Sequence, residues 1–196
     1  MLYAAFFGIA ALAFAVAFLT RKRRGAMAII DAPRFGIVNL KAGAAASMVA
    51  DDTAALTPVL GRPIDSGSTP PQCDVLLMYC DISADGRVQG SDSGLRELIR
   101  DSGASVVVVA SENASEAYVA AARNKGYGRA NLVMTLQRRG DAFPAFFVRL
   151  FSEMKAGVSM PAAWSKLASQ VPGREHTDCP ATIFACERGQ MAFRRR

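Results

Sequence analysis

The chain is poor in the residues that catalysis at neutral pH most often uses. It has a single histidine, His176, among 196 residues. No GxGxxG or GxxxxGKS/T loop follows any predicted strand, and no GxSxG elbow occurs. These absences argue against dinucleotide and P-loop nucleotide binding and against an α/β-hydrolase, and the sequence predicts no cofactor.

A metal site is not expected either. The stretch around His176 reads HTDC, so it offers His176, Asp178 and Cys179, with Cys73 as a more distant candidate. Structural zinc normally takes four ligands in closely spaced pairs, and only one such pair is present. We therefore expect His176 to be solvated in the polar loop before Pro180.

The four cysteines form no CxxC pair. Cys80 and Cys186 lie in apolar, strand-like runs, where a free cysteine behaves as a small hydrophobic residue. A domain of this size does not need disulfides, so we expect reduced thiols and a cytosolic setting.

The net charge of +6 and the pI near 9.5 suggest nucleic-acid binding, but the position of the charges argues against it. Seven of the 23 basic residues lie in two short runs at 21–24 and 194–196. Without them, 16 basic residues face 17 acidic ones. A groove that follows phosphates needs positive charge clustered on a folded face, so no nucleic-acid partner is expected.

Residues 2–20, LYAAFFGIAALAFAVAFLT, carry no charge and are followed by RKRR at 21–24. A helix of 19 residues is about 28 Å long, close to the thickness of a bilayer core. A cleaved signal peptide is the alternative, but it would carry its positive charge before the apolar run. The pattern predicts an uncleaved, single-pass transmembrane helix with the lipid bilayer as a partner.

The direction of this span follows from the basic residues that come after it. Because positive charge favours the cytoplasmic side, the globular domain is predicted to face the cytoplasm. The predicted organisation is an anchor with its basic flank at 1–24, a linker or short first strand at 25–34, a domain at 35–193 and a basic tail at 194–196.

Predicted strands and helices alternate along the domain. Continuous apolar runs, which are typical of strands buried on both faces, occur at FGIVNL (35–40), VLLMYC (75–80), SVVVVA (105–110) and ANLVMTL (130–136). Helices are expected at 44–60, with Pro58 as an early end; at 91–102, capped by Ser91 or Ser93; and at 113–125, 141–156 and 160–170. This alternation predicts an α/β three-layer sandwich with a mostly parallel sheet.

The last part of the chain is expected to close the sheet. Short strands at 182–186 and 190–193 flank Arg188-Gly189, which favours a C-terminal hairpin and an antiparallel edge. Phe146, Phe147, Phe151 and Trp164 are expected to be buried against the sheet.

The stretch 73–193 resembles the CHAT domains, a separase-like family related to caspases. The resemblance lies in an order of segments: VLLMYCDISADG, a helix, VVVVASENAS, a helix ending in Gly-Tyr-Gly, ANLVMTL, a phenylalanine-rich helix, and Ala163-Trp164 before the closing strands. It implies a caspase-like fold, with a catalytic histidine after the first of these strands and a catalytic cysteine after the second.

This chain departs from that dyad. Asp81 stands near the histidine position, and Ser111 stands where the resemblance places the nucleophile. An aspartate with a pKa near 3.9 is a poor base for a serine at neutral pH, so peptidase activity is not expected.

Two classes of function remain open. The first is a membrane-tethered, non-catalytic module that binds a protein partner or assembles. The second is a membrane-anchored hydrolase or peptidase that uses residues at the carboxyl ends of the strands. In open α/β sheets ligands bind at that edge, so the sequence predicts a ligand-binding crevice formed by Asp81, Asp85, Ser111 and Glu112. The candidate catalytic residues are Ser111, Asp81 and Glu112, although capping of the following helix would also account for polar residues at 111–113.

Overall fold

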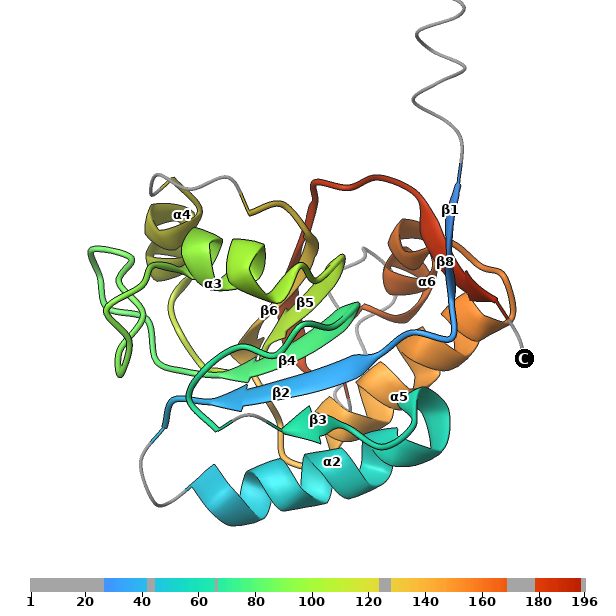
Figure 1. The fold of residues 1–196 in the computed structure, drawn as a ribbon, viewed down its shortest axis with the longest axis horizontal. Coiled ribbons are helices and arrows are strands. Elements are labelled where there is room, and N and C mark those ends of the chain that lie inside the picture. The colour runs from blue at the N-terminus through green and yellow to red at the C-terminus, as the bar shows by residue number, and fades with distance from the viewer. Residues whose placement is uncertain (1–26, 42–44, 66, 124–127, 169–178, 195–196) are drawn as a thin grey trace, which may run out of the picture.

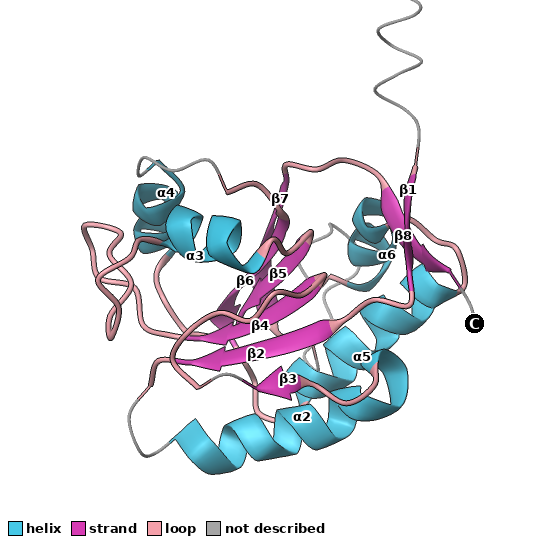
Figure 2. Cartoon of the chain, viewed as in Figure 1, coloured by secondary structure: helices cyan, strands magenta, loops and turns pink. Residues whose placement is uncertain are grey.

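The computed structural model describes residues 27–41, 45–65, 67–123, 128–168 and 179–194. Within them, a central sheet lies between two groups of helices (Figure 1). Helices α3 and α4 cover one face, and α2, α5 and α6 lie on the other (Figure 2). The predicted α/β class with a mostly parallel sheet is therefore confirmed.

The central sheet has six strands in the order β3-β2-β4-β5-β6-β7. Five of them run parallel, and β7 pairs antiparallel with β6. The strands are β2 (Phe35–Asn39), β3 (Ile64–Asp65), β4 (Val75–Tyr79), β5 (Val106–Val109), β6 (Asn131–Gln137) and β7 (Ala181–Cys186).

The helices follow the predicted positions with shifted ends. They are α2 (Ala46–Leu60), α3 (Leu95–Ser102), α4 (Ser115–Arg123), α5 (Ala142–Lys155) and α6 (Met160–Leu167). Helix α2 continues through Pro58 and ends at Leu60. The proline removes only one backbone hydrogen bond of the helix, and the burial of Leu56 and Leu60 against the core outweighs this loss. Helix α3 is capped by Gly94 rather than by a serine, and the Gly94 amide donates to Glu97 Oε2 at 2.9 Å.

Two hydrophobic clusters fill the two sides of the sheet. Strands β4 and β5 are buried along their whole length, as their continuous apolar sequences predict. On the side of α5, the rings of Phe143, Phe146 and Phe151 are buried, and each lies against the buried ring of Phe147. Trp164 is only half-buried, contrary to the prediction, and its indole Nε1 donates to Thr182 Oγ1 at 3.1 Å.

The predicted C-terminal hairpin is wrong. Strand β7 pairs with β6, whereas β8 (Met191–Arg194) pairs in parallel with β1 (Ala28–Asp31) in a separate two-stranded sheet. The side chain of Phe193 faces α5, where its ring lies 6.0 Å from that of Phe151. Burial of β8 against α5 therefore separates it from β7.

The predicted membrane localisation needs correction. In the described ranges, which begin at residue 27, no helix is both long and apolar enough to cross a bilayer. This finding contradicts the prediction of a single-pass membrane protein with a cytoplasmic domain. The predicted span, Leu2–Thr20, itself lies outside the described residues.

The phenylalanine cluster gives a test of the packing. Phe147 is fully buried between Phe143, Phe146 and Phe151. Replacing it with alanine should lower the free energy of unfolding by about 3–5 kcal/mol, because the change leaves a cavity. Urea unfolding of the full chain measures this loss. Val119→Ala on α4, where the side chain is 48% exposed, is the control and should change stability by less than about 0.5 kcal/mol. Equal effects of the two changes would contradict the packing described here.

Candidate functional site

The carboxyl ends of the parallel strands meet at one edge of the sheet, and the candidate residues follow two of those strands. Asp81 comes two residues after β4, and Ser111 and Glu112 follow β5. Strands β4 and β5 are direct neighbours, with Met78 paired to Val109. The structure thus brings these loops together, but it gives each side chain different surroundings.

Ser111 is completely buried. Its Oγ accepts a hydrogen bond of 3.1 Å from the backbone amide of Cys80, and its carbonyl accepts one of 2.8 Å from the Tyr118 hydroxyl. Neither contact supplies a base that could remove the serine proton. Ser111 therefore joins the ends of β4 and β5 and is not exposed as a nucleophile would be.

Asp81 borders a cleft at this edge of the sheet. Its carboxylate forms an ion pair of 2.7 Å with Lys41 Nζ, and both side chains remain partly exposed. The cleft has a volume of about 580 Å³ and is bordered by the Lys41–Asp81 pair and by Leu40, Ala45, Met48, Gln89 and Gly90. It combines apolar walls with one solvent-accessible ion pair.

Gly90 lies close to Leu40 at the border of this cleft. Its φ of +77° lies in the left-handed region, and a Cβ at this position would stand 2.7 Å from the Leu40 carbonyl oxygen. The Gln89 amide also donates to the Asp81 carbonyl at 2.8 Å. The close approach of Gly90 to Leu40 leaves no room for a side chain, so a glycine is needed where the loop after β4 passes the end of β2.

Asp85 does not join the cleft. It lies in an exposed turn where Ser83 Oγ donates to its carboxylate and Arg87 Nε lies 3.2 Å from it. The Ser83 hydrogen bond lowers the pKa of Asp85. The turn packs against α4, since a Cβ on Gly86 would meet the backbone of Ala121 at 2.3 Å.

Glu112 accepts a hydrogen bond of 2.6 Å from the backbone amide of Arg138, which follows β6. Of the four polar residues predicted to form one crevice, only Asp81 borders the cleft described here. Ser111 is buried below the surface, and the other two acidic residues make contacts of their own.

A buried polar network at the same edge was missed by the sequence analysis. The Asp52 carboxylate on α2 accepts a hydrogen bond of 2.7 Å from the Tyr79 hydroxyl and bonds of 2.9 and 3.0 Å from Arg138 Nη2. The Arg138 guanidinium also lies 3.9 Å from the centre of the Phe143 ring. Asp52 is 2% exposed, and this burial raises the pKa of its carboxyl while Tyr79 and Arg138 act in the opposite direction.

A sequence signal for this network did exist. Asp52, Leu56 and Leu60 are spaced by four along α2, so the aspartate occupies a position on the apolar side of the helix. A charged residue at such a position is seldom buried without a partner. The network connects α2 to the ends of β4 and β6, at the same edge of the sheet as the cleft.

Two of the four cysteines, Cys73 and Cys80, are buried. Burial raises the pKa of the Cys80 thiol to about 12, and burial likewise raises the pKa of Cys73 to about 12. Cys186, expected in an apolar run, is exposed at the end of β7. His176 lies outside the described residues, and across those residues no three His, Cys, Asp or Glu side chains gather as metal ligands.

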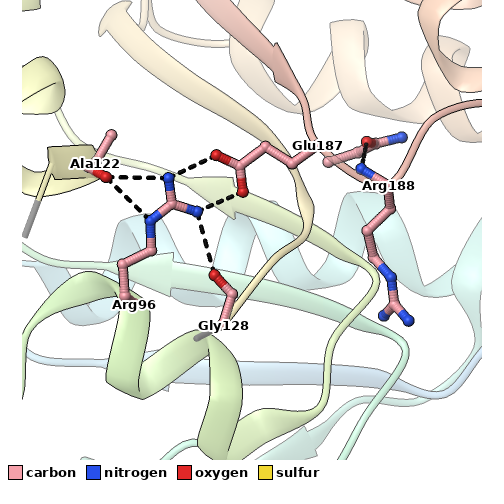
Figure 3. A network of polar contacts seen from close by, with 6 residues as sticks. Arg96, Ala122, Gly128, Glu187 and Arg188 are labelled. Atoms are coloured by element: carbon pink, nitrogen blue, oxygen red, sulfur yellow. Dashed lines mark hydrogen bonds and ion pairs between the residues drawn. The ribbon is translucent and has the colours of Figure 1, made fainter. Parts of the chain in front are cut away.

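The opposite edge of the sheet carries a second polar network (Figure 3). Arg96 on α3 forms a two-pronged ion pair with Glu187, which follows β7, and it also donates to the carbonyls of Ala122 and Gly128. The hydrogen bonds to Glu187 raise the pKa of the Arg96 guanidinium. One arginine thus connects α3, the end of α4, the loop before β6 and the end of β7.

Comparisons with known proteins give no relative for this chain: no family model matches it, and neither a curated protein nor a solved structure is significantly similar to it.

The cysteines provide a test of access at the carboxyl edge. A thiol reagent applied to the native chain at neutral pH should modify the exposed Cys186 and spare Cys73 and Cys80, because both are buried and protonated. Mass spectrometry of labelled peptides measures this, with the urea-unfolded chain as the positive control. Labelling of Cys80 as fast as that of Cys186 would show that the strand ends are open.

The Arg96 network provides a test of stability. Arg96→Met should lower the free energy of unfolding by about 2–3 kcal/mol, since Glu187 and two carbonyls lose their donor in a mostly buried setting. Arg100→Met, which breaks an exposed pair with Asp101, is the matched control and should cost about 0–1 kcal/mol. If urea unfolding gave the same midpoint for both variants, the network would have no structural role.

Proposed function

We propose that this chain is a non-catalytic binding or assembly module on a CHAT-like, caspase-related scaffold. The observation that carries the proposal is the environment of Ser111. The residue at the expected nucleophile position is buried, and its hydroxyl accepts a hydrogen bond from the Cys80 amide. A serine without an adjacent base is a weak nucleophile, and a substrate would also have to reach it.

The arrangement of the strands supports the scaffold part of the proposal. The resemblance pairs a histidine after one strand with a cysteine after the next, and such a dyad requires that these strands be neighbours in space. Strands β4 and β5 are adjacent and parallel, so Asp81 and Ser111 lie at neighbouring strand ends. In place of a dyad, Ser111 joins two strand ends and Asp81 forms an ion pair with Lys41.

The binding part of the proposal concerns the cleft beside the Lys41–Asp81 pair. We take its occupant to be a segment of a protein partner that places an apolar side chain against Leu40 and Met48. A charged side chain of the same segment would exchange with the ion pair. Because this pair is partly exposed, opening it is inexpensive compared with opening the Asp52–Arg138 pair, where Asp52 is almost fully buried.

Covalent labelling tests the absence of catalysis. A fluorophosphonate probe should leave Ser111 unmodified in the full chain, whereas an active serine hydrolase in the same reaction is labelled. The hydrolase alternative predicts labelling of the wild-type chain that disappears in Ser111→Ala. That result would replace the binding proposal with a catalytic one.

Site-specific crosslinking tests the cleft. A photoreactive residue in place of the exposed Gln89 should crosslink one defined protein, and Asp81→Asn should reduce the yield by removing one charge of the pair. A photoreactive residue in place of Val119, exposed on α4, is the control. Equal products from the two positions, or a yield that Asp81→Asn leaves unchanged, would contradict a binding function of this cleft.

A further inference from the structure

A second cleft lies at the amino-terminal edge of the sheet, on the opposite side from Asp81. It has a volume of about 550 Å³ and lies where the segments before β5 and β6 meet the segment after β7. Its lining includes three arginines, Arg100, Arg129 and Arg188, and one carboxylate, Glu187. The proposed function does not use this cleft.

The charges of this cleft do not balance. Glu187 is neutralised by Arg96 in the network of Figure 3, and Arg100 is paired with Asp101 at 2.8 Å. Arg129 and Arg188 have no carboxylate partner within the part of the chain that the structure describes. The cleft therefore carries two positive charges that no described side chain compensates.

Arg188 is held in place by a fully buried side chain. The Asn131 amide oxygen accepts a hydrogen bond of 3.0 Å from the Arg188 backbone amide, and its nitrogen donates to the Gly189 carbonyl at 2.8 Å. Asn131 is 0% exposed. Arg188 Nη1 donates to Ser105 Oγ at 2.8 Å, and in Figure 3 the guanidinium extends away from Glu187. Such fixing lowers the entropic cost of binding a ligand.

The segment that carries Arg129 is fixed as well. Arg96 donates to the carbonyl of Gly128 at 3.2 Å, and a Cβ on Gly128 would lie 2.1 Å from the Arg96 carbonyl oxygen. The chain before β6 is thus pressed against α3, and Arg129 begins from a defined backbone position. The same arginine network that joins four elements also places both uncompensated arginines around one cleft.

From this geometry we infer that the cleft binds a phosphate group, either inorganic phosphate or the phosphate monoester of a small molecule. A guanidinium offers five donors and no acceptor, in a geometry that matches phosphate oxygens. The dianionic charge of a phosphate monoester equals the charge that Arg129 and Arg188 leave unbalanced, whereas a single carboxylate would balance half of it.

Titration of the full chain with inorganic phosphate, and separately with a sugar phosphate, tests the inference. Isothermal calorimetry at low salt should show saturable binding, and Arg129→Gln and Arg188→Gln should each weaken it about tenfold or more, because each removes charge-assisted hydrogen bonds. The matched control is Arg149→Gln on the exposed side of α5, which makes the same charge change and should alter the affinity by less than about twofold. Tighter binding of the sugar phosphate than of inorganic phosphate would identify a phosphate monoester as the preferred ligand.

Three outcomes would overturn the inference. No saturable binding of either ligand is the first. The second is binding that persists in both Arg129→Gln and Arg188→Gln, which would locate it elsewhere, such as the basic residues at 21–24 and 194–196. The third is a single-stranded oligonucleotide that binds more tightly than either phosphate and is lost in Arg188→Gln, which would indicate a nucleic-acid ligand. All three variants change exposed side chains, and unchanged urea midpoints establish that they fold.

Discussion

The rest of the structure depends on the requirement that β4 and β5 be covered on both faces. Their sequences, VLLMY and VVVV, present apolar side chains to both sides of the sheet. Helices α3 and α4 cover one side, and α2 and α5 cover the other (Figure 1). Polar chemistry is thereby confined to the two edges of the sheet, where the strands end.

At each edge a buried polar side chain holds the strand ends together. Ser111 joins the ends of β4 and β5, and the Asp52–Tyr79–Arg138 network joins α2 to β4 and β6. At the other edge, Asn131 and Arg96 hold the ends of β6 and β7. Because an unsatisfied buried polar group is costly, these side chains act as structural connectors and are poorly placed for chemistry. The cleft residues that remain accessible are Lys41 and Asp81 at one edge and Arg129 and Arg188 at the other, and these are the residues that we propose for binding.

The sequence allowed the central strands to be predicted because VVVV and VLLMY are too continuous and too short for an amphipathic helix. It also placed Asp81 and Ser111 at the strand ends. It could not show that Ser111 turns inward, since that depends on the Cys80 amide, which is 31 residues away. The Asp52–Arg138 pair spans 86 residues, so its partner is invisible to local patterns. The hairpin was predicted because Arg188-Gly189 suits a turn. The prediction failed because β7 pairs with β6 and Phe193 packs on Phe151, which separates the two strands.

The central claim is that the position after β5 is closed to a substrate. Ser111→Cys tests it directly, because the change replaces one oxygen by sulfur and makes access measurable as a labelling rate. In a Cys186→Ser background, the account predicts that Cys at position 111 reacts with a thiol reagent as slowly as the buried Cys80. A labelling rate that approaches that of Cys186 in the otherwise unchanged chain would show that the site is open, and it would contradict the proposal of a non-catalytic module.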